Sequence, residues 1–490
     1  MEKSQKKIGV FSLKWPLLGL LIMFYGCTST SQKEESAEEA PSATPNFVVI
    51  FADDMGYGDL GVYGHPTIKT PNLDKMAYEG QKWTNFYVAA NVCTPSRACL
   101  LTGRYAVRNG MTSNKRWVLF PDSDGGLPQT EITIAKALKG AGYATSAVGK
   151  WHLGHLPQYL PTSHGFDSYF GIPYSNDMDR VSVEGGDQRK VFMDPKVENF
   201  NVPLMRNEEI VERPADQNTI TKRYTEEAVK FITDNKDKPF FLYLAHNLPH
   251  VPLFTSDEFR GTSERGLYGD VIEEIDWSAG QIVETLKKLG IDKNTLVVFT
   301  SDNGPWVIFN SHGGSSGSLY GAKGTSYEGG QREPAIFWWP GTVKPNVVSG
   351  IGSTLDILPT FASLAGVELP QDRTYDGYDL SPVLKSGASS PRNEMIYYHQ
   401  ERIFAARKGD YKLYFYKNNP AGYPEKLEKL TKYQLFNLSV DPSEKYDVIE
   451  ENPQIAKEIE EMVAKHEAGV EPMLNQLEKR IGEPLSNESK

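Results

Sequence analysis

Cysteine is scarce in this chain: 490 residues contain only three, at Cys27, Cys93 and Cys99. So few cysteines exclude a framework of several disulfides. The composition is otherwise ordinary, with 39% hydrophobic and 23% charged residues, and a chain of this length can bury a sizeable core. Stability must therefore come from that core, and a cysteine kept in such a chain is a candidate for chemistry.

Clusters of basic residues are absent after residue 14, and the net charge is -11. Nucleic-acid binding needs a basic face that neutralises phosphates, so the sequence disfavours a nucleic-acid partner. Any anionic substrate must instead be met by a few local cations, because the overall field of the protein repels it.

The apolar run from Trp15 to Tyr25 is shorter than the roughly 20 residues of a membrane-spanning helix. Basic residues precede it, at Lys3, Lys6, Lys7 and Lys14. This order is typical of a secretory signal peptide, which we place at residues 1–27. Cys27 directly follows a glycine, as in bacterial lipoproteins, where such a cysteine is lipidated; an ordinary cleaved signal with an incidental cysteine is the alternative.

Residues 28–45 are rich in Ser, Thr, Glu and Pro and have no apolar periodicity, so they are expected to form a flexible tether. The sequence thus predicts an exported protein of the periplasm, or a lipoprotein of the outer membrane or cell surface. A lipid anchor would be its link to the membrane.

Strand and helix patterns alternate over residues 46–385. Apolar, β-rich runs lie at 46–52, 143–148, 240–245 and 295–300. Helical patterns lie at 71–80, 130–141, 221–233 and 268–289. Strands that are apolar on both faces and alternate with helices indicate an α/β fold, a parallel sheet covered by helices on both sides.

The pattern changes after residue 385. Short strands are expected at 395–398, 403–407, 411–416 and 433–437, followed by a closing helix near 452–478. Residues 386–490 are therefore expected to form a smaller C-terminal subdomain with an antiparallel sheet.

Polar side chains directly follow three of the predicted strands: Asp53-Asp54, His246 with His250, and Asp302-Asn303. In open parallel sheets, ligand-binding groups gather at the carboxyl ends of the strands. Carboxylate and amide oxygens suit Ca²⁺ or Mg²⁺ better than Zn²⁺. Taken singly, each pair could also be a helix cap or a turn, and His246 is expected to be buried outside the site.

Cys93-Thr94-Pro95-Ser96-Arg97 matches the signature Cys-x-Pro-x-Arg of the formylglycine-dependent (type I) sulfatases. Further segments that resemble this family follow in family order, namely 149–154 (GKWHLG), 250–252 (HVP), 301–304 (SDNG) and 321–324 (GAKG). Segments 171–175 (GIPYS) and 327–334 (YEGGQREP) resemble the branch of arylsulfatase A and N-acetylgalactosamine-6-sulfatase. The resemblance covers about residues 46–450, and Asp447 stands where the family's C-terminal motif usually has asparagine.

This resemblance implies an alkaline-phosphatase-like fold with a large mixed, mostly parallel sheet. It also implies that a maturase oxidises Cys93 to formylglycine, whose hydrate attacks sulfur through one hydroxyl and expels sulfate through the other. One Ca²⁺ would be held by Asp53, Asp54, Asp302 and Asn303 together with an oxygen of modified Cys93.

The remaining roles implied by the resemblance belong to side chains around the sulfate. Arg97 would hold the formylglycine hydroxyl, and Lys150 and Lys323 would bind sulfate oxygens. His152 would act as the base that releases sulfate, and His250 would protonate the leaving oxygen. Ser175 is a further candidate for contact with the substrate.

The function expected from these features is hydrolysis of a sulfated carbohydrate, such as a galactose or N-acetylgalactosamine sulfate. Residues 176–215, with Trp306 and His312, are candidates for shaping the sugar subsites. Two alternatives remain open: a phosphoester or phosphonate hydrolase of the same superfamily, which can use the same groups, and a surface glycan-binding protein without catalysis.

Overall fold

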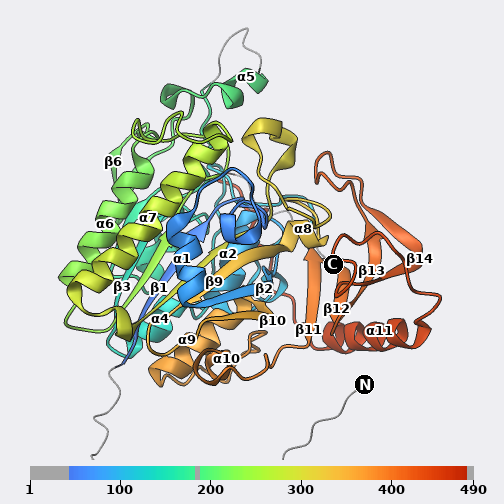
Figure 1. Ribbon diagram of the computed structural model, residues 1–490. Coiled ribbons are helices and arrows are strands. Elements are labelled where there is room, and N and C mark those ends of the chain that lie inside the picture. Colours follow the sequence, from blue (N-terminus) through green and yellow to red (C-terminus); the bar gives the residue numbers. More distant parts are fainter. Residues whose placement is uncertain (1–43, 182–187, 483–490) are drawn as a thin grey trace, which may run out of the picture. The chain divides into compact units, whose positions relative to one another are not determined.

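The larger of the two sheets in the described structure has ten strands (Figure 1). In spatial order its strands are β10 (Asn346–Ser353), β2 (Gln81–Tyr87), β9 (Arg332–Trp338), β8 (Thr295–Ser301), β1 (Asn46–Ala52), β7 (Phe240–Ala245), β3 (Ala144–Gly149), β4 (Ser168–Gly171), β5 (Leu204–Arg206) and β6 (Glu209–Glu212). Only β9 and β5 run against the others. The prediction of a large mixed, mostly parallel sheet is confirmed.

The computed structural model describes residues 44–181 and 188–482, which belong to one compact unit. The predicted signal peptide, Cys27 and nearly all of the tether lie outside the described residues. Within the described ranges, no helix combines the length and the apolar character needed to cross a membrane.

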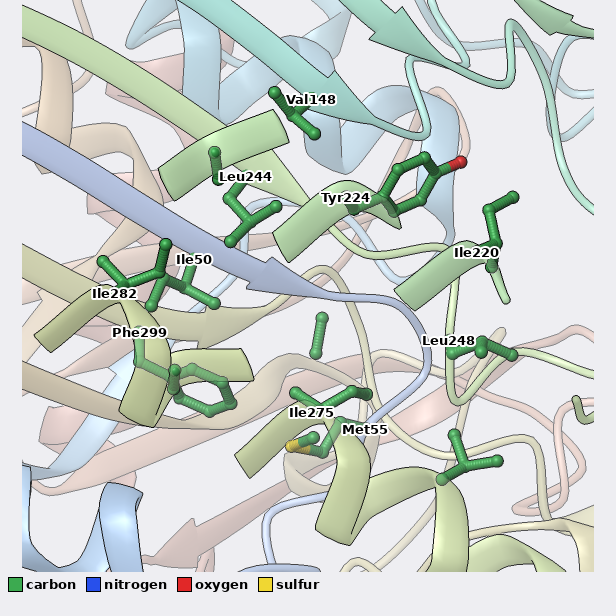
Figure 2. Close-up of a cluster of buried hydrophobic side chains, with 14 of the residues drawn as sticks. Ile50, Met55, Val148, Ile220, Tyr224, Leu244, Leu248, Ile275, Ile282 and Phe299 are labelled. Carbon is green, nitrogen blue, oxygen red and sulfur yellow. The ribbon is translucent and has the colours of Figure 1, made fainter. Parts of the chain in front are cut away.

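Helices cover both faces of the sheet, as the two-sided apolar strands predict. On one face, Val48 and Ile50 of β1 pack with residues of α1 (Pro71–Glu79), α6 (Ile220–Asp234) and α7 (Leu267–Leu289). Figure 2 shows part of this cluster, with Ile50, Ile275, Ile282 and Phe299 gathered together. On the other face, Phe47 and Val49 pack with α2 (Cys93–Thr102), α4 (Ile134–Gly140) and α9 (Ile357–Ala365).

A second, antiparallel sheet consists of β11 (Glu394–His399), β12 (Arg402–Lys408), β13 (Tyr411–Lys417) and β14 (Glu428–Asn437). Helix α11 (Pro453–Ala468) buries Ala456, Ile459 and Val463 against it. The antiparallel C-terminal sheet is therefore confirmed. The predicted boundary at residue 385 stays a prediction; α10 (Ser381–Ser386) ends close to it and β11 begins at Glu394.

Two predicted helices differ in length from the observed ones. The closing helix ends at Ala468 rather than near residue 478, because Gly469 is a poor helix former and the chain then turns to bond with another segment: the Met473 amide donates to the Val107 carbonyl at 2.9 Å. Helix α4 begins at Ile134 rather than 130, because the Thr133 hydroxyl accepts a hydrogen bond from the Lys136 amide and caps the helix there.

Candidate functional site

The carboxyl ends of neighbouring parallel strands bring the predicted acidic residues together. Asp53 and Asp54 follow β1, Asp302 and Asn303 follow the adjacent β8, and Lys150 follows β3, which is separated from β1 by β7. All five are buried. The chain must turn sharply here, since Asp54 adopts a positive φ of 64°, a conformation uncommon outside glycine and frequent at functional sites.

Cys93 is the first residue of α2, and Arg97 lies one turn later on the same helix. The Arg97 guanidinium donates from Nε and Nη2 to Asp302 Oδ2, at 3.0 and 2.8 Å, and from Nη1 to the Lys150 carbonyl at 3.0 Å. Its side chain is fully buried. Arg97 therefore ties the helix that carries Cys93 to the acidic cluster.

Two lysines complete the arrangement. Lys150 Nζ lies 2.5 Å from Asp53 Oδ2 and donates to Ser175 Oγ at 3.2 Å. Lys323 Nζ lies 2.7 Å from Asp54 Oδ2 and 3.7 Å from Cys93 Sγ. Burial alone would raise the pKa of Asp53, but Lys150 and then Arg97 hold it far below its usual range. The cluster thus offers several cations to an incoming anion, inside an acidic protein.

The two site histidines use different ring nitrogens for their hydrogen bonds to the backbone, and so different nitrogens remain free of such bonds. His152 Nε2 donates to the Leu119 carbonyl at 2.9 Å, and its buried Nδ1 has no hydrogen-bond partner among the described residues. His250 Nδ1 donates to the Val251 carbonyl, and its Nε2 lies 3.7 Å from Asp54 Oδ2. Burial lowers the pKa of both rings well below the usual range, with Lys150 adding to the effect at His152 and Lys323 at His250. Both rings are neutral at neutral pH, and each has one nitrogen lone pair available.

The acidic residues fit a hard divalent cation. Asp53 Oδ1 and Asn303 Oδ1 are buried without a hydrogen-bond partner among the described residues, and a cation would satisfy them. Ligand atoms of Asp53, Cys93 and Asp302 lie within 4.8 Å of one another. Burial raises the pKa of Asp54 to about 6, and burial with the charge of Asp53 raises that of Asp302 to about 7. A bound cation would relieve this crowding of carboxylates.

Cys93 itself is a weak nucleophile as encoded. Burial raises the pKa of its thiol to about 12, against the opposing effect of Lys150 and Lys323. The thiol is therefore protonated at neutral pH, and thiolate chemistry is disfavoured.

The sequence assigned no individual role to some residues at the site, although Asn176 lies in the segment 176–215 that was expected to shape the sugar subsites. Asn176 Nδ2 donates to the Pro252 carbonyl at 3.1 Å and to the Gln217 side chain at 3.1 Å, and so holds the loop that carries His250. Tyr423, in the connection between β13 and β14, packs its ring 5.5 Å from that of Trp306. Its neighbour Gly422 lies so close to Lys323 that a Cβ would meet the Lys323 carbonyl at 1.9 Å. The sequence did contain one indication that Asn176 belongs to the site, since it directly follows the predicted site residue Ser175.

Of the other residues considered in the sequence, some lie at the site and some lie elsewhere. Trp306 lies at the site, its ring centroid 4.3 Å from Lys323 Nζ. His246 is buried against Ser278 Oγ at 3.3 Å and takes no part in the cluster, as expected. Cys99 is buried in the core next to the C-terminal sheet. His312 is the last residue of a short helical segment at residues 307–312 and is hydrogen-bonded to the Phe192 backbone, and its role in a sugar subsite stays a prediction.

Curated proteins with similar sequences include sulfatases. Arylsulfatase A from Homo sapiens is 42% identical over 440 residues, which cover 84% of this chain and 84% of that protein. N-acetylgalactosamine-6-sulfatase from Rattus norvegicus is 44% identical over 389 residues, which cover 76% of this chain and 71% of that protein.

Solved structures of similar fold include glycan-related proteins. A Bacteroides thetaiotaomicron protein, described under the metabolism of multiple glycosaminoglycans, superposes with a TM-score of 0.75 at 31% identity and covers 87% of this chain and 100% of its own. Ps i-CgsB, solved in complex with k-i-k-neocarrahexaose, gives a TM-score of 0.73 at 32% identity and covers 89% of this chain and 95% of its own.

The family models match the two parts of the chain in turn. The sulfatase model matches residues 45–367, and the model for the C-terminal region of aryl-sulfatase matches residues 390–488. These matches, with relatives above 40% identity and the clustered Cys93, Arg97 and acidic residues, show that the chain belongs to the sulfatase family and is a sulfuric ester hydrolase.

Proposed function

We propose that the protein removes sulfate from a sulfated carbohydrate of the galactose or N-acetylgalactosamine type. The observation that carries the proposal is the position of Cys93, buried beside Lys323 and facing the acidic cluster to which Arg97 and Lys150 are bound. The names of the N-acetylgalactosamine-6-sulfatase relatives and the k-i-k-neocarrahexaose in the Ps i-CgsB structure support the choice of substrate class.

The residues present fit the two groups that the family typically uses, formylglycine and a divalent cation. Cys93, oxidised by a maturase, would supply the formylglycine, and Asp53, Asp54, Asp302 and Asn303 would hold the cation, which we propose is Ca²⁺. When bound, the cation supplies Lewis-acid stabilisation of charge on the sulfuryl group, and the hydrated aldehyde supplies a nucleophilic hydroxyl with a second hydroxyl beside it.

The side chains around Cys93 bind the substrate and move its protons. Lys150 and Lys323 would bind sulfuryl oxygens, and Arg97, which is hydrogen-bonded to Asp302 and to the Lys150 carbonyl, would hold the formylglycine hydroxyl. His152 Nδ1 has no hydrogen-bond partner among the described residues, and its lone pair would accept the proton that is lost when sulfate is released. His250 would donate a proton from Nε2 to the leaving oxygen, and an anionic substrate would favour the protonated ring that this role needs.

The direct test compares ester classes on protein produced together with its maturase and supplied with Ca²⁺. We expect release of inorganic sulfate from mono- and disaccharide sulfates, with aryl sulfate hydrolysed well ahead of aryl phosphate. Preference for the phosphate would support a phosphoester or phosphonate hydrolase instead. An unmodified Cys93 thiol in protein from the native organism, found by mass spectrometry, would support a non-catalytic glycan-binding protein.

Calcium should stabilise the protein more strongly at high pH than at low pH. The folded-state pKa values of Asp54 and Asp302, about 6 and about 7, lie above the ordinary carboxyl value. Without a cation, their contribution to stability is therefore present at low pH and is lost as the pH rises through 6 to 7, when two buried charges form. A cation binds these charged forms, so the gain in melting temperature on adding Ca²⁺ should grow between pH 5 and pH 8.

At a Ca²⁺ concentration of 100 times Kd the expected gain is about 2.7 kcal/mol of unfolding free energy. Differential scanning calorimetry at both pH values measures it. Asp276 is a matched control, because burial raises its pKa to about 6 at a position outside the cluster. Asp276→Asn should keep the response to Ca²⁺ and Asp302→Asn should lose it; a response that is independent of pH would contradict this assignment.

We further propose that the protein is exported to the periplasm or the cell surface and anchored there by lipid on Cys27. Support comes from the basic, apolar and cysteine order of residues 1–27. Membrane fractionation of the Cys27→Ala variant tests the anchor, since the variant should leave the membrane fraction.

A further inference from the structure

Asp177 places an unpaired carboxylate oxygen beside the catalytic lysines. It lies two residues after Ser175, whose hydroxyl accepts a hydrogen bond from Lys150 Nζ at 3.2 Å. Asp177 Oδ1 is buried and has no hydrogen-bond partner among the described residues. Burial raises the pKa of Asp177, whereas a hydrogen bond with the Ser175 side chain and the charges of Lys150 and Lys323 lower it, so the carboxylate lies close to the group of residues that includes these lysines. None of the roles assigned above uses this oxygen.

Trp306 supplies an unpaired donor close to Lys323. Its ring centroid lies 4.3 Å from Lys323 Nζ and 5.3 Å from that of the His250 ring. Its indole Nε1 is buried and lacks a hydrogen-bond partner within the described ranges. A buried acceptor and a buried donor, each without a partner among the described residues, thus lie near the lysines that are expected to bind the sulfate ester, and buried polar groups normally have partners.

Aromatic rings continue outward from Trp306. The Tyr423 ring lies 5.5 Å from that of Trp306, and the Trp117 ring lies 5.0 Å from that of Tyr423. All three residues are partly exposed. An apolar wall with a few fixed polar groups suits a ligand that has both apolar faces and hydroxyl groups. A pyranose ring has this character, because its C–H faces are apolar and its hydroxyls both donate and accept.

The charge of Asp177 decides which substituent can lie next to it. A hydroxyl would donate to Oδ1 in a charge-assisted hydrogen bond, which is among the stronger ones in proteins. A second sulfate group at the same place would bring two anions together in a poorly solvated site, where like charges repel strongly. An uncharged aryl or alkyl group would leave the carboxylate unpaired.

We infer that Asp177 and Trp306 select a sugar ring with a free hydroxyl next to the sulfate ester, and reject a ring that carries a second sulfate there. This inference rests on the proposed function and adds to it the substituent beside the reacting ester. Asp177 acts here as a specificity residue that binds substrate, while Lys150 and Lys323 bind the sulfate itself.

The test compares substrates on the matured enzyme loaded with Ca²⁺. N-acetylgalactosamine 4-sulfate, its 6-sulfate, the 4,6-disulfate and 4-nitrophenyl sulfate are the probes. For the wild type, kcat/KM for the better monosulfate should exceed that for the disulfate by about tenfold or more. Asp177→Ala should lower the ratio of kcat/KM for that monosulfate to kcat/KM for 4-nitrophenyl sulfate by about tenfold to a hundredfold, since a charge-assisted bond to the sugar is lost.

Two further variants separate recognition from structure. Asp177→Asn keeps the shape of the side chain but removes its charge. It should therefore reduce the ratio of kcat/KM for the monosulfate to kcat/KM for the disulfate, even if Asp177→Ala folds poorly. Asp179→Asn is the matched control: Asp179 is in the same loop but pairs with Arg213 at 2.8 Å, and its loss should leave both ratios as in the wild type.

Each outcome has a clear meaning. If kcat/KM of the Asp177 variants falls by the same factor for sugar sulfate and for 4-nitrophenyl sulfate, Asp177 merely positions Lys150 and Ser175. The inference then fails while the proposed function stands. A wild type that hydrolyses the disulfate as fast as the monosulfate also overturns the inference alone. A wild type that releases no sulfate from any of the sugars overturns the proposed function and the inference with it.

Discussion

Replacement of Cys93 by serine should leave a protein that completes at most one turnover. A plain hydroxyl at this position can attack sulfur, but it has no second hydroxyl on the same carbon to expel the sulfate, and water hydrolyses the resulting ester slowly. Steady-state kcat should therefore fall on the order of 10⁴-fold or more, as for the loss of other covalent nucleophiles. The Cys93→Ser protein should also gain the mass of one SO₃ group after incubation with substrate.

Sulfate assays and intact-protein mass spectrometry measure the two effects. Cys99→Ala is the matched control, because Cys99 is buried on the same helix and packs in the core beside the C-terminal sheet. It should keep its turnover and change mainly the melting temperature. Sustained turnover by Cys93→Ser would show that the chemistry does not need a modified cysteine, and the proposed mechanism would then be wrong.

Replacement of Lys323 by alanine should have the second largest effect. Lys323 Nζ lies 3.7 Å from Cys93 Sγ and 2.7 Å from the Asp54 carboxylate. The variant loses a cation at the sulfuryl group and leaves a buried carboxylate without its partner, each of which costs several kcal/mol in an enclosed site. We expect kcat/KM to fall about 1,000-fold, mostly through kcat, because the charge on the ester grows in the transition state.

A second lysine serves as the control for this substitution. Lys82 of β2 lies 5.5 Å from the centroid of the Tyr63 ring and donates to the Val62 carbonyl, so it resembles Lys323 in packing against an aromatic ring but lies outside the cluster. Lys82→Ala should leave kcat/KM close to the wild-type value. A loss of less than tenfold for Lys323→Ala would argue that this lysine orders Asp54 and Trp306 and does not bind the substrate.

Much of the cluster could be placed from the sequence because one rule of parallel sheets governs it. Asp53-Asp54 and Asp302-Asn303 each follow an apolar strand, and β1 and β8 proved to be neighbours in the sheet. The pairing of Cys93 with Arg97 required only the spacing of one helical turn. Lys150 and Lys323 were added to the predicted site only because their segments follow in family order. Both lie in loops, and no local sequence pattern would have identified them.

Residues at the rim of the site could not be predicted in the same way. Tyr423 reaches Trp306 only because the C-terminal sheet packs against the first part of the chain, and no periodicity in the sequence reports that contact. Strand β2 reads QKWTNFY, in which polar and apolar residues are mixed, so it gave no clear strand pattern. Asp177 has no motif at all: its importance lies in an oxygen that finds no partner, which only coordinates can reveal.

The connection between β13 and β14 has a consequence for how such enzymes can diversify. It brings Tyr423 to the aromatic wall, and through Gly422 it touches the main chain of Lys323, yet it contributes none of the acidic or basic groups that act on sulfur. Exchange of this one hairpin loop between relatives should therefore change which sulfate esters are accepted and leave the groups that act on sulfur as they are.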